Sequence, residues 1–425
     1  MIDPLFEPGK IGTLLTKNRL VRSATWEGLA DEEGTVTSPL IDLYASLAEG
    51  GAGLIITGHS YVHPAGKHAP RQLGSYADQM VPGLQALARA VHRRDGRIAL
   101  QLSFGGAYLS QSRVARMTRE DMAEVARSFG RAAGRARQAG FDAVQILAAH
   151  GFFLSQLLCP RYNPRTDDYG GSIANRARAV LEAIQAVRWE AGGDFPLLVK
   201  WNSSDLVENG LDLEDSIRAA SLVEEAGADA LEISGGLLNR PDLLADRQDR
   251  DNGKAFFETA ARLFQEKISI PLILVGGIRS YQTARRLVEE GTVDYIALCR
   301  PFIREPGLAN RWASGDQRDA ACISCNQCVE ELKQGHGLQC RPAEPREVQT
   351  FFPQQSETIP AGQPFPAGTA YRVSYGLEDW QGKYLPVVKV QMIQGEKALG
   401  EGLSLPGTSE GWREVAQSIE KIITS

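Results

Sequence analysis

The sequence lacks the features that would place a protein in a membrane or on a nucleic acid. None of its apolar runs reaches the roughly 18 residues that a membrane-spanning helix needs. The N-terminal segment MIDPLFEPGKIG has no basic region followed by an apolar core, which a secretory signal would show. Asp and Glu (52) outnumber Lys and Arg (46), whereas nucleic-acid-binding domains present a basic face. We therefore expect a cytoplasmic protein that binds neither membranes nor nucleic acids.

Cysteine is also scarce, with six residues, and four of them fall close together in the spacing C-x2-C-x2-C-x11-C. Clustered cysteines in a chain without an export signal indicate metal binding rather than disulfides. Three thiolates on one short loop and a distant fourth suit a [4Fe–4S] cluster, whereas structural zinc usually takes two separated pairs. We favour the cluster over zinc or unligated thiols, with these ligands: Cys322, Cys325, Cys328 and Cys340.

Histidine is equally rare, and His59, His63 and His68 make up half of the six histidines. Their spacings of four and five residues are not specific for a metal site. We interpret this segment as a pocket-lining or surface loop, with metal binding as the alternative.

What the chain does contain is a regular alternation of apolar strands and amphipathic helices. Eight such units over about 300 residues predict a (β/α)8 TIM barrel, with a doubly wound open sheet as the alternative. The predicted strands are Leu20–Ala24, Gly53–Gly58, Ile98–Leu102, Ala143–Leu147, Leu197–Trp201, Ala230–Ser234, Leu272–Val275 and Tyr295–Leu298. The predicted helices are Pro39–Glu49, Met80–Arg94, Arg119–Ala139, Ile173–Ala191, Leu213–Ala226, Lys254–Glu266, Ser280–Glu290 and Glu305–Ala313.

The pattern changes after the barrel, and we predict three further segments. Residues 1–315 form the barrel, residues 316–341 carry the cysteines, and residues 342–369, with six prolines, form a linker. Residues 370–425 are predicted to form a small ββα domain with strands at Ala370–Gly376 and Leu385–Ile393 and a helix at Trp412–Ile423. A domain this small has a marginal core, so we expect it to pack on the barrel or on a neighbouring subunit of a homo-oligomer.

The ends of the last two predicted strands resemble a phosphate site. They read VGGIR at 275–279 and LCRP at 298–301, and loops after strands 7 and 8 of such barrels frequently bind phosphate. Ordinary strand-to-helix turns are the alternative. Gln101 and Lys200 end other apolar strands, where an amide could pair with a pyrimidine-like edge and a cation could stabilise a reduced heterocycle. The alternative for both is a strand-end residue that reaches solvent.

These residues together resemble the Old Yellow Enzyme family of FMN-dependent NADH:flavin oxidoreductases, over roughly residues 4 to 341. The CISCNQC run with Cys340 resembles its iron–sulfur branch, which includes trimethylamine dehydrogenase and 2,4-dienoyl-CoA reductase. The matching segments are NRLVRSAT (18–25), GGAGLIITG (50–58), AAHGFFLSQLLCPRYNPRTDDYGGSIANRAR (148–178), VGGIR (275–279) and CRPFIREP (299–306).

The resemblance implies which residues bind FMN. Trp26 occupies a flavin-tuning position that often holds Thr, Cys or His, and Lys200 stands where the family commonly has Arg. Cys299 replaces the usual Gly. The implied isoalloxazine contacts are Ser23, Ala24, Thr25, Trp26, Gly58, Gln101 and Lys200, and the implied phosphate contacts are Gly276, Gly277, Cys299 and Arg300.

The stretch Phe141–Gly171 departs from the family where substrates bind. Ene-reducing members have two His, or His and Asn, that hold the substrate carbonyl, and a Tyr that supplies a proton. The matching positions are Leu147, His150 and Phe152, so one anchor and the usual acid are replaced. We expect His150 to orient the substrate. Replacement proton donors could be His59, Tyr61, Tyr108 or Tyr169.

The sequence therefore predicts an FMN-dependent oxidoreductase that exchanges hydride with a small organic substrate or NAD(P)H and relays electrons through a [4Fe–4S] cluster. Residues 370–425 contain no G-x-G-x-x-G unit. Electrons would then come directly from NAD(P)H, or pass to a separate electron-transfer partner protein. The alternatives are an NAD(P)H-dependent ene-reductase with a relocated proton donor and an electron-transfer subunit of a larger complex.

Overall fold

The computed structural model divides the chain into two compact units, Met1–Arg341 and Pro342–Ser425. It describes residues 3–105, 111–237, 255–341, 351–361, 367–380, 383–395, 397–398 and 403–406. The cysteine segment 316–341 falls within the first unit. No helix in these ranges is both long enough and apolar enough to cross a membrane.

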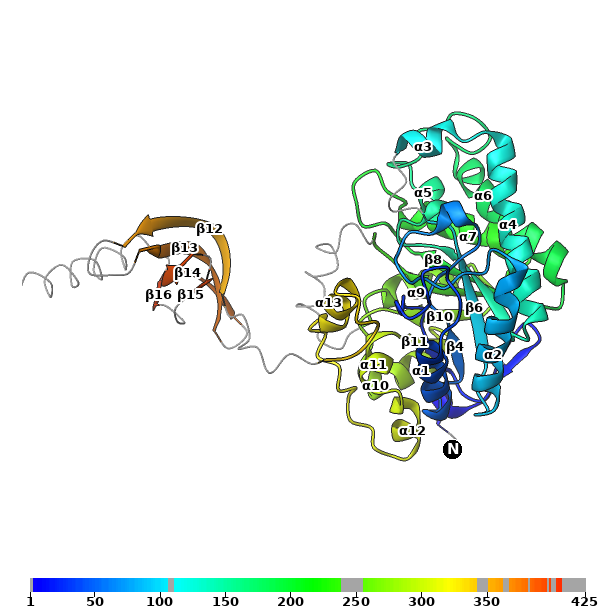
Figure 1. Ribbon diagram of the computed structural model, residues 1–425, viewed down its shortest axis with the longest axis horizontal. Coiled ribbons are helices and arrows are strands. Elements are labelled where there is room, and N and C mark those ends of the chain that lie inside the picture. The colour runs from blue at the N-terminus through cyan, green and yellow to red at the C-terminus, as the bar shows by residue number, and fades with distance from the viewer. Residues whose placement is uncertain are drawn as a thin grey trace, which may run out of the picture. The chain divides into compact units, whose positions relative to one another are not determined.

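The first unit is a closed barrel of parallel strands (Figure 1). Each strand pairs with its neighbour along the chain, and the pairing of β11 with β3 closes the ring. The barrel strands are β3 (Leu20–Arg22), β4 (Leu54–Ile56), β6 (Ile98–Ser103), β7 (Ala143–Ala148), β8 (Leu197–Asn202), β9 (Ala230–Ser234), β10 (Leu272–Val275) and β11 (Tyr295–Leu298). All eight coincide with predicted strands, which confirms the TIM barrel.

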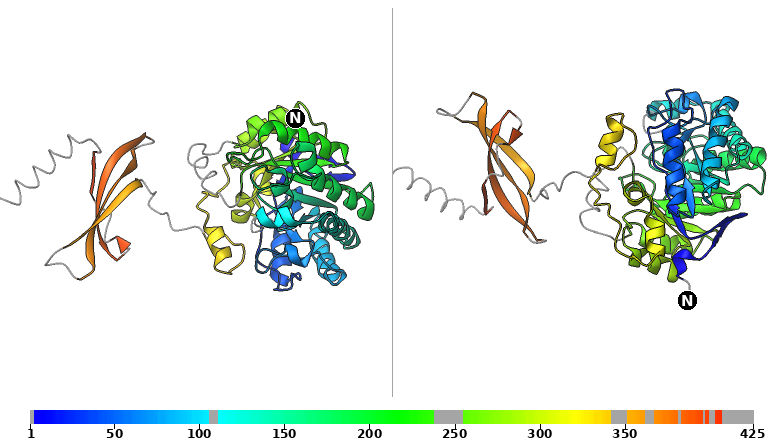
Figure 2. Two further views of the ribbon diagram at one scale, coloured as in Figure 1. Left: turned by 90° about the horizontal axis from the view of Figure 1, so that it is seen from above. Right: turned by 60° about the horizontal axis from the view of Figure 1, so that its bottom comes forward.

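Helices surround the strands, as the turned views show (Figure 2). Hydroxyl and carboxylate side chains cap several of them; Thr118 and Asp121, for example, form a capping box at α4. The barrel-covering helices are α1 (Ser38–Glu49), α2 (Val81–His92), α4 (Arg119–Gln138), α6 (Ile173–Ala191), α7 (Leu213–Glu225), α9 (Glu258–Gln265), α10 (Tyr281–Glu289) and α12 (Leu308–Ala313). Within the described residues, four short α-helices were not predicted: α3 (Gln111–Arg116), α5 (Phe153–Leu158), α11 (Arg300–Arg304) and α13 (Gln327–Lys333).

The inside of the barrel is layered along the strands. Its lower layer is an apolar cluster that includes Val21, Ala99 and Leu198. The hairpin of β1 (Gly9–Ile11) and β2 (Leu14–Thr16) contributes to the same cluster and closes this end. Strand side chains repeat their direction every second residue, so the next layer toward the carboxyl ends begins two residues further on. That layer is polar and buried: Ser23, Gln101, Gln145, Lys200 and Glu232.

The second unit is an antiparallel sheet, and here one prediction is wrong. The expected linker 342–369 contains a strand, β12 (Phe351–Pro360). The strands predicted at 370–376 and 385–393 lie within β13 (Thr369–Trp380) and β14 (Lys383–Gln394). Two short strands, β15 (Lys397–Ala398) and β16 (Leu403–Pro406), pair with β14. The helix predicted at 412–423 lies outside the described residues.

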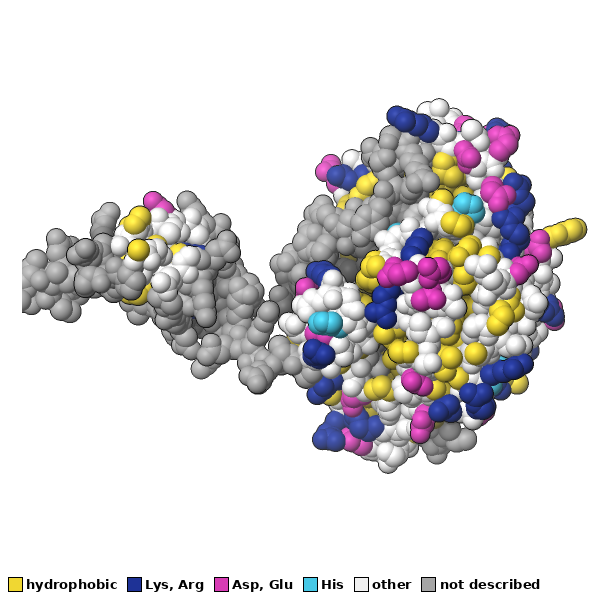
Figure 3. Space-filling model, in the orientation of Figure 1, with side chains coloured by type: hydrophobic (Ala, Val, Ile, Leu, Met, Phe, Trp, Pro, Cys, Tyr) yellow, Lys and Arg dark blue, Asp and Glu magenta, His cyan; other side chains and the backbone are white. Residues whose placement is uncertain are grey.

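Acidic and basic side chains are mixed over the described face of the barrel in Figure 3. Many form exposed ion pairs between neighbouring helical turns, such as Arg285 with Glu289. Pairs of this kind add little stability and maintain a hydrated surface.

Candidate active site

A chain of hydrogen bonds links the polar layer at the mouth of the barrel. Gln101 Nε2 donates to Gln145 Oε1 at 2.6 Å, and Gln145 Nε2 donates to Glu232 Oε2 at 2.7 Å. Lys200 Nζ lies 2.8 Å from Glu232 Oε1 and 2.8 Å from Ser23 Oγ, which itself donates to Glu232. The side-chain bonds therefore fix the orientation of every residue in this layer.

Lys200 favours the ionised form of the Glu232 carboxyl although both side chains are buried. Burial opposes a charged Glu232 carboxyl, but Lys200 and the hydrogen bonds from Ser23 and Gln145 outweigh it, so the pKa of Glu232 is lowered. The amide of Gln101 donates to its neighbour, which leaves its own Oε1 as an acceptor facing the site. The layer thus offers one cation and one amide acceptor to a bound heterocycle.

Three members of this layer, Ser23, Gln101 and Lys200, are among the predicted site residues, whereas Gln145 and Glu232 are not. Both interrupt buried apolar strands, AVQILA and ALEIS, in the same way that Gln101 and Lys200 do. A polar residue at mid-strand was therefore a usable signal for all of them. What the sequence does not show is that the pairing of β8 with β9 places Lys200 opposite Glu232.

All four predicted phosphate contacts, Gly276, Gly277, Cys299 and Arg300, line one pocket. Gly276 and Gly277 have φ values of 125° and 75°, which side-chain-bearing residues rarely adopt. A Cβ at Gly276 would also meet the ring of Phe257 at 2.9 Å. Both positions therefore favour glycine, and no side chain of theirs separates the backbone from a bound phosphate.

The predicted flavin contacts after β3 and β4 lie beside the polar layer and the phosphate pocket. Thr25 Oγ1 is 2.9 Å from Cys299 Sγ, so the end of β3 adjoins the phosphate pocket. The N–H of Gly58 donates to Glu27 Oε1 at 2.6 Å and to Tyr44 Oη at 2.9 Å, so it is not available to a ligand. Ala24 is partly buried and packs on the apolar layer below.

Trp26 provides a test of whether the site suits a flavin. Its indole Nε1–H is buried and has no hydrogen-bond partner among the described residues. Buried donors are nearly always satisfied, so this one indicates a missing acceptor. A flavin carries several acceptor atoms. The orphaned indole donor, the amide acceptor of Gln101 and the bare glycine pocket fit FMN.

His150 lies at the carboxyl end of β7 in a left-handed conformation with φ of 62°. Its Nδ1 is 3.3 Å from the Gly236 carbonyl, which can only accept, so Nδ1 carries the proton. Its Nε2 is 3.1 Å from Ser234 Oγ, which then donates. Burial, followed by the charge of Lys200, lowers the pKa of His150 to about 4. The ring is neutral and held in one orientation.

Two other histidines lie together beside Phe152. His59 Nε2 and His68 Nε2 are 3.0 Å apart, and the rings are stacked with centroids 4.5 Å apart. Phe152 meets both rings edge-on, at centroid distances of 5.2 and 4.8 Å. Burial lowers the pKa of His68 to about 4 and that of His59 well below its usual value. Of the three histidines in this loop, His63 instead contacts Phe104.

The tyrosines considered as proton donors are engaged elsewhere. Tyr61 Oη donates to the Glu33 carbonyl at 2.5 Å, and burial raises its pKa. Tyr169 donates to Glu182 on the outside of the barrel, and burial raises its pKa to about 12. Tyr108 lies outside the described residues.

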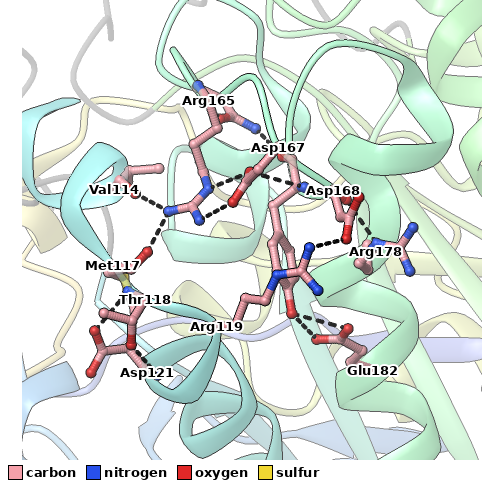
Figure 4. Close-up of polar contacts among 12 residues, drawn as sticks. Val114, Met117, Thr118, Arg119, Asp121, Arg165, Asp167, Asp168, Arg178 and Glu182 are labelled. Atoms are coloured by element: carbon pink, nitrogen blue, oxygen red, sulfur yellow. Dashed lines mark hydrogen bonds and ion pairs between the residues drawn. The ribbon is translucent and has the colours of Figure 1, made fainter.

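The loop RTDDYGG (165–171) is held by polar contacts to neighbouring segments (Figure 4). Arg165 pairs with Asp167 and donates to the carbonyls of Val114 and Met117 at 2.8 and 2.7 Å. Asp168 pairs with Arg119. The loop thereby ties the segment after β7 to the α3–α4 connection.

The four clustered cysteines lie around α13 and are free thiols. Burial raises the pKa of Cys328 to about 11, and Cys299, Arg300, Cys322 and Cys340 also influence it, so these groups share one neighbourhood. No three His, Cys, Asp or Glu side chains converge on a metal position within the described ranges. The donor chemistry suits an iron–sulfur cluster, whereas the sulfur atoms do not have the convergence of an assembled site.

The cysteine segment contacts the phosphate pocket and Trp26. Arg279 Nη1 donates to Ser324 Oγ at 3.1 Å, and Arg300 Nη1 donates to Asn326 Oδ1 at 2.8 Å. Ser324 also lines the phosphate pocket. Trp26 packs on a buried cluster formed by Cys328, Leu332 and Leu338. The two candidate cofactor sites therefore adjoin each other.

Comparison with protein families gives one match over most of the first unit. The family described as NADH:flavin oxidoreductase / NADH oxidase matches residues 4–116 and 109–319. A 4,4'-dithiodibutanoate disulfide reductase of Rhodococcus erythropolis is 31% identical over 379 residues, covering 78% of this chain and 93% of that protein. An NADH oxidase of Thermoanaerobacter brockii is 32% identical over 345 residues, covering 76% of this chain but 52% of its own length.

Solved structures resemble the barrel in the same way. A 2-naphthoyl-CoA reductase in complex with 2-naphthoyl-CoA superposes with a TM-score of 0.72 at 26% identity, covering 80% of this chain and 57% of that one. A histamine dehydrogenase from Rhizobium sp. 4-9 has a TM-score of 0.70 at 25% identity, covering 80% and 52%. The chain thus spans only about half the length of several of its relatives.

Proposed function

The chain belongs to the NADH:flavin oxidoreductase / NADH oxidase family, and from that premise we propose that it binds FMN at the mouth of the barrel. The protein is a flavin-dependent oxidoreductase. In our proposal it exchanges a hydride between the flavin and a small organic substrate or NAD(P)H. Bound FMN would supply the hydride-accepting and hydride-donating group, and a bound [4Fe–4S] cluster would carry single electrons.

The polar layer has a definite role in this proposal. Lys200 would place its charge beside the flavin's pyrimidine end, where negative charge develops on reduction. Gln101 would accept a hydrogen bond through Oε1, the atom that its bond to Gln145 leaves open. Glu232 would hold Lys200 and Gln145 in place. Trp26 would donate its unpartnered indole N–H to the flavin.

The remaining contacts come from the residues after β3 and β4 and from the phosphate pocket. Ser23, Thr25 and Gly58 would line the ring, while Arg300 would hold the phosphate above the bare glycine backbone. His150 would orient the substrate as a neutral ring. The four thiols that would hold the cluster are Cys322, Cys325, Cys328 and Cys340, which adjoin Trp26 through Cys328.

The observation that carries the proposal is the buried Lys200–Glu232 pair with its attached amides. Burying two charges and two amides costs free energy that an apolar layer would not. Their fixed arrangement at the open end of the barrel, beside a glycine-lined pocket, is what a reducible heterocycle with a phosphate tail requires.

Anaerobic purification followed by titration with FMN tests the proposal. We expect a yellow protein with about one FMN per chain, reduced by NADH or NADPH. Arg300→Ala should weaken FMN binding by about tenfold or more, because a charged contact to the phosphate is lost. Arg304→Ala is the matched control, since Arg304 is exposed on the same helix. A protein that binds no flavin under these conditions would refute the proposal.

Iron and acid-labile sulfide analysis tests the cluster separately. We expect about four iron atoms per chain and broad absorption near 400 nm, lost on Cys325→Ser. Zinc in place of iron would refute the cluster but not the flavin. If the bound flavin is reduced only in the presence of a partner protein, the chain acts as an electron-transfer subunit.

Ene reduction is the second candidate, and the histidine pair at Phe152 favours it. This pair contacts Phe152, which stands at the position that the resemblance assigns to the proton-donating Tyr of ene-reducing members. Turnover of an enone with NAD(P)H by the purified protein would support this candidate over single-electron transfer through the cluster.

A further inference from the structure

We propose that His59 and His68 form a two-histidine proton relay that protonates the substrate in place of the missing tyrosine. The inference rests on the proposed flavin chemistry and deepens it, because it assigns the proton that must accompany each hydride. The relevant substrate class is an activated alkene, conjugated to a carbonyl group.

The distance between the rings shows that the pair shares one proton. Two imidazole nitrogens 3.0 Å apart can hydrogen-bond only if one carries a proton and the other presents a lone pair. With both rings neutral, one ring is protonated at Nε2 and bonds through it, and the other is protonated at Nδ1. Each ring thus holds one proton, and a single proton lies between the rings.

The pair is held in place by a buried glutamine rather than by chance packing. Gln72 Oε1 accepts from the backbone N–H of His68 at 3.0 Å, and Gln72 Nε2 donates to the His59 carbonyl at 3.0 Å. Gln72 is fully buried. Its amide therefore fixes the backbone at both histidines and keeps the two rings stacked.

The location of the pair matches the missing acid. His59 directly follows Gly58 at the carboxyl end of β4, where barrels of this type bind substrates. Phe152 is buried and contacts both imidazole rings, so a hydroxyl on its ring would lie close to the pair. Both histidines are partly exposed, but Nδ1 of His68 is shielded from water, so His59 is the ring that exchanges protons with water.

The proton transfer balances without forming a charged ring. An alkene that receives a hydride at its β-carbon is reduced by two electrons, and its π electrons move to the α-carbon. His68, protonated at Nδ1, gives that proton to the α-carbon and takes the shared proton at Nε2. His59 loses the shared proton and gains one from water at Nδ1. Neither ring becomes an imidazolium ion, in keeping with their buried surroundings.

Separate half-reactions test the relay in His59→Leu and His68→Leu. Reduction of the flavin by NAD(P)H needs no proton on carbon, so its rate should stay within about twofold of the unmodified protein. Reoxidation by cyclohex-2-enone should slow by about tenfold or more in each variant, because general acid catalysis is lost. The double variant should be no slower than either single one, since a relay acts as a unit.

Two further variants control for structural effects. His63→Asn changes a histidine of the same loop that lies outside the pair, and reoxidation by the enone should be unchanged. Phe152→Tyr introduced into His59→Leu should restore reoxidation at least severalfold, because the new hydroxyl can supply the proton. Reoxidation by ferricyanide, which takes no proton on carbon, should be unaffected throughout.

The outcomes separate this inference from the proposed function. Reoxidation by the enone within twofold of normal in both leucine variants would overturn the relay. Failure of the enone to reoxidise the unmodified reduced protein would also overturn it, while leaving the flavin proposal intact. Absence of flavin reduction in the unmodified protein would instead refute the proposed function.

Discussion

At the scale of single residues, the mouth of the barrel depends on one buried charge. Glu232 is fully buried and is the only carboxylate in the described polar layer, where Lys200, Ser23 and Gln145 all bond to it. Its loss would leave the Lys200 ammonium group without a counter-charge in a buried site. Breaking such a pair from one side costs more than removing both partners.

A double-mutant cycle measures this dependence. Glu232→Gln should lower the free energy of unfolding by about 3 to 5 kcal/mol, because Lys200 becomes an uncompensated buried charge. Combining it with Lys200→Met should recover part of that loss, since no charge then remains. Urea unfolding of the four proteins gives the coupling energy. If the loss of unfolding free energy in the double variant equals the sum of the losses in the two single variants, the ion pair between Lys200 and Glu232 is contradicted.

The buried imidazoles make stability depend on pH. The pKa values of His68 and His150 are lowered to about 4 in the folded protein, whereas a histidine in the unfolded chain has a pKa of about 6.5. Between these values the unfolded chain binds more protons, so stability should fall as the pH drops from about 6.5 toward 4. Unfolding at several pH values should show a shallower loss in His68→Gln. An unchanged slope would contradict the shift.

Single residues also show what the sequence can and cannot predict about the site. Gln101, Lys200 and the paired glycines were recognisable because a polar residue or a glycine stood out in an apolar run. The partners were not recognisable, because Glu232 reaches Lys200 across neighbouring strands rather than along the chain. The His59–His68 bond likewise depends on how one loop folds back on itself.

At the scale of elements, the barrel strands were predictable because their burial is continuous. A parallel strand covered on both faces is a short apolar run, and each one here is buried throughout. The short helices α3 and α5 were not predictable, because six residues are too few for a helical repeat of apolar positions to be recognised.

Strand β12 shows why composition misled the prediction of a linker. Proline cannot donate to a strand ladder and is tolerated at bulges, at strand ends and on edge strands. The register of β12 against β13 shifts just after Pro353, and Pro360 is its last residue. β12 is also the edge of its sheet. The prolines therefore lie at the positions that a strand allows.

The loop after β7 is an element whose stability can be tested. The Arg165 side chain is 6% exposed and bonds to two carbonyls as well as to Asp167, whereas the Arg119–Asp168 pair is largely exposed. Arg165→Ala should cost about 2 to 3 kcal/mol of unfolding free energy, because two partly buried carbonyls lose their charged donor. Arg119→Ala should cost under about 1 kcal/mol. Equal losses of unfolding free energy in the two variants, measured by thermal or urea unfolding, would show that the hydrogen bonds of Arg165 do not stabilise the loop.

At the scale of the whole molecule, the residues proposed to carry the chemistry all belong to the first unit. Every strand of the barrel, every proposed FMN contact and all four clustered cysteines lie within residues 1–341. The described strands of the second unit pair only with one another. Nothing in the proposed chemistry therefore requires a residue of the second unit.

A chain shortened to residues 1–341 tests this division. We expect it to fold and to bind FMN with an affinity within about twofold of the full chain, because the hydrogen-bonded layer and the glycine pocket are intact. Its iron content should also be unchanged if the four cysteines alone hold the cluster. Flavin fluorescence and metal analysis of the purified fragment give both values.

A well-folded fragment that loses flavin would show that the sheet of residues 351–406 takes part in the flavin site. Loss of iron alone would mean that the cysteine segment depends on the second unit for the convergence of its sulfur atoms. Because the sulfur atoms around α13 do not converge in the described residues, the iron measurement is the sharper of the two.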